Sequence, residues 1–147
     1  MHAKIIKHTT IYQYGDSMYL LTHEYFHQWM ESYGRTSEEN DPRASANLFA
    51  QDAVYYENPF AEPIVGRDAI YDYWLQGAQT LKEKETTFHV FSVKDNLGIA
   101  RWNAKFSVVA SDKRIALDCL FVVEFDANGL CRTFREWWHS QEEMPAR

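Results

Sequence analysis

The sequence has little cysteine and no long apolar run. Its only cysteines among 147 residues are Cys119 and Cys131, too few for the disulfide framework of a small secreted domain. No apolar segment approaches the roughly 20 residues that a membrane-spanning helix needs. The N-terminal sequence MHAKIIKHTTIYQYGDS is too polar for a signal peptide. We therefore expect a cytoplasmic protein.

Basic clusters and glycine-rich loops are also missing. The formal net charge is −6, and lysine and arginine form no run, whereas nucleic acids and anionic membranes attract basic surfaces. The GRDA turn at 66–69 is typical of a helix start and lacks the glycine pattern that binds phosphate. We expect neither nucleic acid nor membrane as a partner, and no metal or nucleotide cofactor.

The sequence is rich in aromatic residues, which make up 16% of the chain. Aromatic rings fill a core and also line cavities for organic ligands. The length suits one domain with a single core. We expect this domain to cover residues 1–147, with residues 1–16 as an N-terminal arm or an edge strand.

The hydrophobic periodicity changes from helical to strand-like along the chain. In the first half it predicts helices over 17–33, 42–49 and from 67 to about 77 or 84, with Asp16 or Ser17 as the first cap. A strand over 53–57 lies between the last two helices. From Glu85 on, a period of two predicts strands over 86–94, 99–110, 114–126 and 130–140. This order indicates an α+β fold, with helices on one face of a curved antiparallel sheet.

The last hairpin is expected to place Cys119 opposite Glu136 and Phe121 opposite Phe134. One face of the hairpin then carries Cys119, Phe121, Val123, Phe134, Glu136 and Trp138. The other face carries Asp118, Leu120, Val122, Thr133, Arg135 and Trp137. Because both faces are partly apolar, we expect one to face the helices and a pocket, and the other to face a partner such as a second copy of the chain.

Four motifs give the sequence a resemblance to a known family. They are Trp29 on the first helix, LFAQDAVYYENP, VGRDAIYDYW and EFDANGLCRTFREWWH. Over about residues 17–140 the chain resembles the SnoaL-like branch of the nuclear transport factor 2-like superfamily. The resemblance implies a cone-shaped, cystatin-like fold with a pocket between the helices and the concave sheet, usually as a dimer. We expect a homodimer through the sheet face.

Ketosteroid isomerase belongs to that superfamily, and the resemblance implies counterparts of its site residues. Tyr25 matches the tyrosine on its first helix. Its general base corresponds to Glu57 when residues are counted forward from Phe49 and Ala50, and to Asn58 when they are counted back from Pro59. We prefer Glu57, because a neutral amide cannot take up a proton. The position of its second oxyanion donor is Phe121 here, a departure from the isomerase pattern.

The candidate catalytic residues are therefore Glu57 as base, Tyr25 as oxyanion donor and Glu136 as a second acid or base. Desolvation in an aromatic cavity raises a carboxylate pKa toward neutrality, where proton transfer is efficient. The other interpretation is that Glu136 pairs with an arginine and Glu57 caps a loop. The candidate ligand-binding residues are Tyr55, Trp29, Trp74, Trp102, Phe121, Phe134 and Trp138.

Two functions fit these residues. The first is cofactor-free acid/base chemistry on a small apolar organic ligand, as in an isomerase, dehydratase or cyclase. The second is a non-catalytic module that binds a small ligand or a partner. The HEYFH segment formally matches a zinc-protease pattern. Because His23 and His27 lie nearly opposite the apolar stripe of the first helix, a solvent-exposed helix face is the preferred interpretation.

Overall fold

The computed structural model describes residues 2–6, 9–14 and 18–144, and it contains two sheets and three helices in this part of the chain. The helices are α1 (His23–Glu38), α2 (Pro42–Ala46) and α3 (Arg67–Thr80). The larger sheet consists of β4 (Phe49–Tyr56), β5 (Ile64–Val65), β6 (Leu81–Lys94), β7 (Leu97–Val108), β8 (Arg114–Phe125) and β9 (Cys131–Glu142). None of the described helices is long and apolar enough to cross a membrane.

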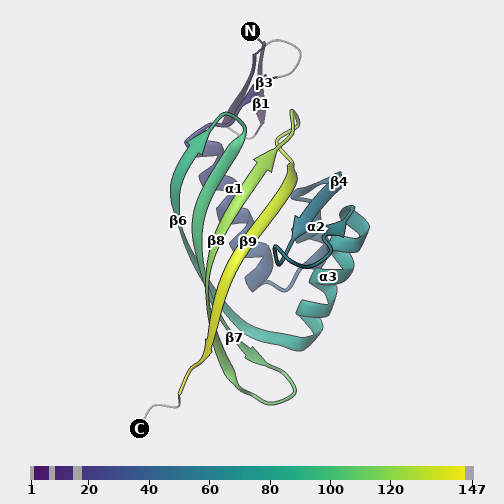
Figure 1. The fold of residues 1–147 in the computed structure, drawn as a ribbon, viewed down its shortest axis with the longest axis vertical. Coiled ribbons are helices and arrows are strands. Elements are labelled where there is room, and N and C mark those ends of the chain that lie inside the picture. Colours follow the sequence, from purple (N-terminus) through teal and green to yellow (C-terminus); the bar gives the residue numbers. More distant parts are fainter. Residues whose placement is uncertain (1, 7–8, 15–17, 145–147) are drawn as a thin grey trace.

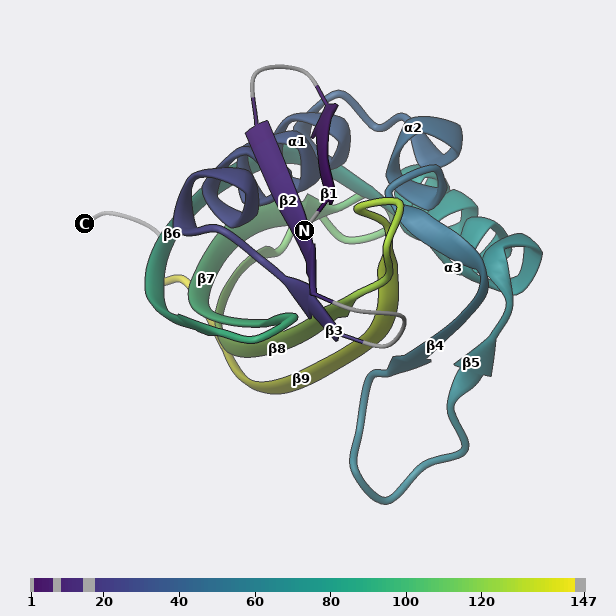
Figure 2. The same cartoon turned by 90° about the horizontal axis from the view of Figure 1, so that it is seen from above.

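The larger sheet has the strand order β5-β4-β9-β8-β7-β6 and curves around the helices (Figures 1 and 2). Strands β6 to β9 form an antiparallel meander, as the period of two predicts. The expected α+β fold, with helices on the concave face of a curved sheet, is confirmed. One pairing differs from the expected antiparallel sheet: β4 lies parallel to β9, so the sheet is mixed.

The N-terminal segment contains three strands, β1 (His2–Ile6), β2 (Thr9–Tyr14) and β3 (Met18–Leu20), which form a separate antiparallel sheet. Residues 18–20 were expected in the first helix. That helix instead begins after Thr22, whose hydroxyl accepts a hydrogen bond from the backbone N–H of Tyr25 at 3.1 Å. This bond satisfies one of the free donors of the first turn. The predicted caps, Asp16 and Ser17, lie outside the described residues.

Helix α1 also continues past Gly34, where we expected it to end. A Cβ atom at Gly34 would lie 2.9 Å from Thr86 Oγ1 and 3.4 Å from the ring of Trp102. The glycine therefore lets the helix pack closely on β6 and β7, and it does not cap the helix. Helix α3 ends at Thr80, and β6 begins directly at Leu81, five residues earlier than predicted.

The register of the last hairpin is shifted by two residues from the prediction. Phe121 pairs with Glu136, and Cys119 pairs with Trp138. The carboxylate of Asp126 accepts hydrogen bonds from the N–H groups of Asn128 and Leu130, and this holds the connecting loop in place. Because a two-residue shift preserves the alternation of side chains, the two predicted faces are correct although the register is wrong.

Aromatic rings dominate the core between the helices and the sheet. Phe134 of β9 lies between two tyrosines and stacks on both. Its ring centroid is 4.7 Å from that of Tyr55 on β4 and 5.6 Å from that of Tyr33 on α1, with interplanar angles of 12° and 13°. All three side chains are buried. The stack joins the helix layer to two strands and fixes where the tyrosine hydroxyls lie.

Candidate functional site

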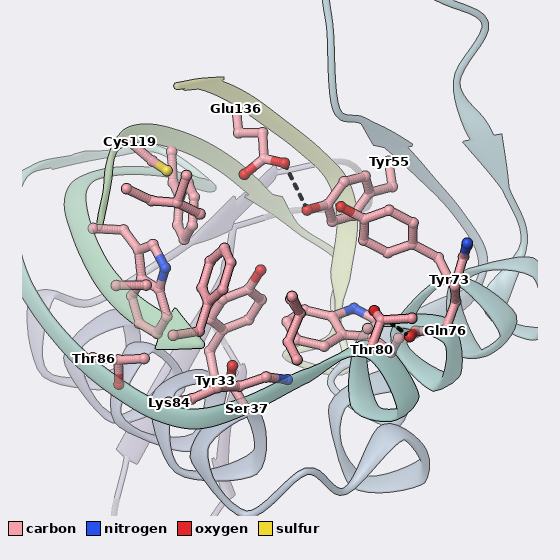
Figure 3. Close-up of a pocket in the computed structure, with 18 residues that line it drawn as sticks. Tyr33, Ser37, Tyr55, Tyr73, Gln76, Thr80, Lys84, Thr86, Cys119 and Glu136 are labelled. Atoms are coloured by element: carbon pink, nitrogen blue, oxygen red, sulfur yellow. Dashed lines mark hydrogen bonds between the residues drawn. The ribbon is translucent and has the colours of Figure 1, made fainter. Parts of the chain in front are cut away.

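A cavity of about 260 Å³ opens between α1, α3 and the concave face of the sheet. Its volume lies just below the range of about 300–1,000 Å³ that is common for small-molecule sites. Most of its wall is apolar, and it includes the rings of Trp74, Trp102 and Phe121. Figure 3 shows the polar side chains that extend into it from α1, α3, β6 and β9. The space is thus a small aromatic chamber with a few polar groups.

Glu136 is the carboxylate in this chamber. It lies on β9 beside buried neighbours, and the hydroxyl of Tyr55 donates a hydrogen bond to Glu136 Oε1 at 3.0 Å (Figure 3). Desolvation raises the pKa of Glu136 to about 8, with a smaller rise from the charge of Glu57 and an opposing effect of the Tyr55 hydrogen bond. A carboxyl group with this pKa exchanges protons near neutral pH, which is the property of an acid/base catalyst.

Three tyrosines surround the carboxylate. Burial raises the pKa values of Tyr33, Tyr55 and Tyr73 well above their usual range, and the charge of Glu136 raises them further. All three therefore remain protonated and act as hydrogen-bond donors at neutral pH. Tyr73 of α3 donates to Glu57 Oε1 at 3.1 Å. The tyrosines thus place neutral donors around one ionisable acid.

Glu57, the expected base, lies outside the cavity wall and is exposed. Strand β4 ends at Tyr56, so Glu57 begins the loop that follows and extends past the edge of the cavity. Its carboxylate accepts from Tyr73, and its backbone carbonyl accepts from Trp138 Nε1 at 3.2 Å. Glu57 therefore acts on the site through its charge and through Tyr73, without lining it.

Tyr25, the expected oxyanion donor, also does not line the cavity. Its hydroxyl donates to the backbone carbonyl of Gly129, in the loop between β8 and β9. Its ring packs edge-on against Phe125 with centroids 5.9 Å apart. The structure thus places Tyr25 at a contact between α1 and the loop and does not bring it together with Glu136.

We expect Tyr25→Phe to lower the free energy of unfolding by about 1 kcal/mol, because it removes one partly buried hydrogen bond and keeps the ring contact. Affinity for a ligand in the cavity should not change. Urea unfolding and ligand titration of the variant measure the two quantities. Weaker ligand binding at unchanged stability would contradict this placement.

The expected ligand-binding aromatic residues separate into three groups. Those in the cavity wall are Tyr55, Trp74, Trp102 and Phe121. Trp29 and Phe134 are buried in the packed core behind the wall. Trp138 is 44% exposed near the end of β9, because the sheet there extends beyond the helices that would cover it. Four of the seven residues are therefore placed to touch a ligand.

Sequence reasoning missed Tyr33, Tyr73 and Lys84, which also line the cavity. Tyr33 continues the stripe of α1 by one turn after Trp29, and this spacing was a usable signal. Tyr73 directly precedes Trp74, on the same helix. Lys84 alternates with Thr86, Phe88 and Val90 on the inner face of β6. The period of two was therefore a usable signal, but the predicted strand began only at residue 86. His23 and His27 are exposed, as expected from the helical angles.

Comparison with solved structures supports the fold. A hypothetical protein with a ketosteroid isomerase-like fold from Catenulispora acidiphila, solved with trimethylamine, is 11% identical, with a TM-score of 0.66 over 75% of this chain and 84% of its own. A candidate isomerase from Bacillus subtilis is 22% identical, with a TM-score of 0.69 over 79% and 87%. SalBIII, an epoxide hydrolase/cyclase-like enzyme with a role in pyran ring formation in salinomycin, is 17% identical, with a TM-score of 0.67 over 77% and 89%.

At these identities the likeness establishes the fold alone. No curated protein sequence matches the chain significantly. The family model of the SnoaL-like domain, in contrast, matches residues 27–133, which include most of α1, all of α3 and the meander as far as the start of β9. This match covers well over half of the chain. The protein therefore belongs to the SnoaL-like domain family.

Proposed function

We propose that this protein is a cofactor-free acid/base enzyme of the isomerase or cyclase type that acts on a small organic carbonyl compound. One observation carries the proposal: Glu136 lies in an aromatic cavity, is hydrogen-bonded by Tyr55, and has a pKa of about 8. The descriptions of similar structures as an isomerase or a cyclase-like enzyme support this class of chemistry.

In the proposed reaction, ionised Glu136 removes a proton from the carbon beside the substrate carbonyl. The electrons of the broken C–H bond form the enolate double bond, and the negative charge moves to the carbonyl oxygen. The carboxylic acid then returns the proton to another carbon of the enolate, and the carbonyl re-forms. In the cyclase route, the enolate carbon attacks a second carbonyl carbon of the same molecule, the π electrons of that C=O bond move to its oxygen, and Glu136 gives its proton to the resulting alkoxide. Both routes restore ionised Glu136.

The enolate oxygen needs a hydrogen-bond donor that is not already used. Trp74 Nε1 is buried, lines the cavity and has no hydrogen-bond partner among the residues that the structure describes. A buried unpaired donor is costly in a folded protein, and a ligand oxygen would satisfy it. We assign Trp74 this role, which in ketosteroid isomerase belongs to groups that this chain either lacks or places elsewhere.

Deuterium exchange tests the proposal without knowledge of the natural substrate. NMR follows exchange of the protons beside the carbonyl of phenylacetone and related small aromatic ketones in D₂O. We expect the wild-type protein to accelerate exchange, and Glu136→Gln to lower the rate by about 10²-fold or more, the usual contribution of a general base. The rate should rise with pH toward the pKa of Glu136, about 8.

Glu57→Gln is the matched control, because it removes a carboxylate that acts on the site only from outside. It should retain most of the exchange rate and move the pH midpoint downward, since the charge of Glu57 raises the pKa of Glu136. Equal rates in wild type and Glu136→Gln would reject the enzyme hypothesis. They would favour the second function, a module that binds a small ligand without converting it.

We also propose that a second copy of the chain covers the outer face of the sheet. Leu120 and Trp137 pair across β8 and β9 on that face and are 38% and 46% exposed. Burial of these apolar side chains favours association. Light scattering should show a dimer for the wild type and a monomer for Trp137→Glu. A monomeric wild-type protein would contradict the proposal.

A further inference from the structure

Lys84 extends into the cavity from β6 and has no protein partner. It lies on the concave face of the sheet, where its neighbours along the strand, Thr86, Phe88 and Val90, are also at least partly buried. No hydrogen bond or ion pair joins its ammonium group to any other residue that the structure describes. Burial alone lowers the pKa of Lys84, because no acidic group acts on it. An unpaired cation on a core face is unusual.

A β-bulge places Lys82 and Lys84 on opposite faces of β6. The register between β6 and β7 shifts between Lys82 and Glu85, and Glu83 has a φ of 53°, a left-handed conformation that non-glycine residues seldom adopt. As a result, Lys82 points outward and pairs with Asp112 at 2.6 Å, while Lys84, two residues later, faces the cavity. Regular alternation would have placed both lysines on one face.

Two hydrogen bonds fix the bulge. Glu83 Oε2 accepts from the hydroxyl of Ser107 at 3.0 Å, and the backbone carbonyl of Glu83 accepts from Arg114 Nη1 at 2.6 Å. The surrounding structure thus stabilises an unfavourable backbone conformation that turns Lys82 away from the cavity, so that Lys84 is the one lysine in the described wall. Strained backbone held in this way often occurs at functional sites.

The charges of the cavity wall do not balance at neutral pH. Two residues of the wall carry a charge in their usual states, Lys84 and Glu136. With a pKa of about 8, Glu136 is mostly protonated at pH 7, and the tyrosines are neutral. Figure 3 shows Lys84 and Glu136 on different strands at opposite sides of the cavity, and no ion pair joins them. The cavity wall therefore has a net positive charge.

We propose that the ligand is a small organic carboxylate, with its carboxylate group at Lys84 and the rest of the molecule between the aromatic rings, toward Glu136. A single ammonium group matches a monoanion, whereas a phosphate dianion calls for more donors than this wall supplies. Ser37, in the same wall, lies beside Lys84 in Figure 3, and its hydroxyl is a second donor for such a carboxylate. If the proposed function holds, the same molecule also carries a carbonyl group that reacts at Glu136. The substrate is then a keto acid, an assignment that rests on the proposed function.

Matched pairs of acids and amides test the proposal. Calorimetric titration at pH 7 compares phenylacetate, 3-phenylpropionate and cinnamate with their uncharged amides, which have nearly the same shape. We expect the wild-type protein to bind at least one acid about tenfold or more tightly than its amide, as a charge-assisted hydrogen bond predicts. Failure of every acid to bind at millimolar concentration would overturn the proposal.

Variants of two lysines on the same strand separate a local effect of charge from a general one. Lys84→Met should abolish the preference for the acid, and Lys84→Arg should keep part of it, because the charge remains. Lys82→Met removes an equal charge from the outer face and should leave the preference unchanged. Equal losses in Lys82→Met and Lys84→Met, or a preference retained by Lys84→Met, would contradict the assignment.

Glu136→Gln distinguishes this inference from the proposed function. At pH 7 the amide replaces a carboxyl group that is already mostly neutral, so the variant should keep the preference for the acid. Loss of deuterium exchange together with a retained preference supports both proposals. A retained preference with no effect of Glu136→Gln on exchange would reject the catalytic role and leave the carboxylate site standing.

Discussion

The wild-type protein is expected to lose stability on the order of 4 kcal/mol between about pH 5 and about pH 8, and Glu136→Gln to abolish this loss. The native pKa of Glu136 is about 8, against an ordinary value of 4.5. Between these values the native state holds a proton that the unfolded state has released. The free energy of unfolding therefore falls by about 1.4 kcal/mol per pH unit, and the contribution of Glu136 becomes constant above its native pKa.

Urea unfolding of both proteins at a series of pH values measures this effect. Other titrating groups are shared, so the difference between the two curves reports Glu136. The variant should match the wild type near pH 5 and become more stable toward pH 9, since an amide has no ionised form to desolvate. Parallel curves over the whole range would show that Glu136 has an ordinary pKa and is not buried in the cavity.

Phe134→Ala is expected to lower the free energy of unfolding by about 3–5 kcal/mol, the usual cost of removing a buried phenylalanine ring. Phe134 is fully buried and stacks on Tyr33 and Tyr55. Its removal also frees the two tyrosines, so ligand binding and the hydrogen bond from Tyr55 to Glu136 should weaken. Urea unfolding gives the stability, and near-ultraviolet circular dichroism reports the order of the rings.

Two variants bracket this result. Phe134→Leu fills part of the space and should cost less than the alanine change. Phe60→Ala removes a ring that is 96% exposed, and the change should stay within about 0.5 kcal/mol. A loss below about 1 kcal/mol for Phe134→Ala would show that the stack does not hold the tyrosines in place.

Alternation along the strands predicted which sheet face is buried, and this is why Glu136 was found. Its position on the same face as Phe121 and Phe134 follows from the period of two alone, and it survives the two-residue error in register. The register itself depends on the loop held by Asp126 and on a bulge at Glu124 and Phe125. Such local geometry leaves no periodic trace in the sequence.

Helical periodicity predicted a face but not a position along it. Tyr25, Trp29 and Tyr33 follow one another by single turns and share the buried stripe of α1. Only Tyr33, at the C-terminal end, reaches the cavity, while Tyr25 contacts Gly129 near the other end. The depth of the cavity depends on how β6 and α3 close it, which is a property of tertiary packing. The resemblance to ketosteroid isomerase led to the same error, because it matched Tyr25 by its place on the first helix and did not indicate how far along that helix the cavity lies.

Glu57 and Lys84 show how the ends of strands determine a site. Glu57 follows the alternation of β4 but lies one residue beyond its end, so its side chain is exposed. Lys84 is charged and would be expected on the surface, yet it lies on the inner face of β6 in alternation with Thr86 and Phe88. In both cases the residue type and the period were visible, and the residue at which the strand ends or begins was not.

A ¹³C NMR titration of the Glu136 carboxyl group tests the central claim most directly. The resonance is assigned by its absence from Glu136→Gln, and its chemical shift is followed as the pH rises. A midpoint near 8 is predicted, because the cavity desolvates the ionised form. A midpoint near the ordinary value of 4.5 would show that water reaches the carboxylate freely and would contradict both its burial and its proposed role in proton transfer.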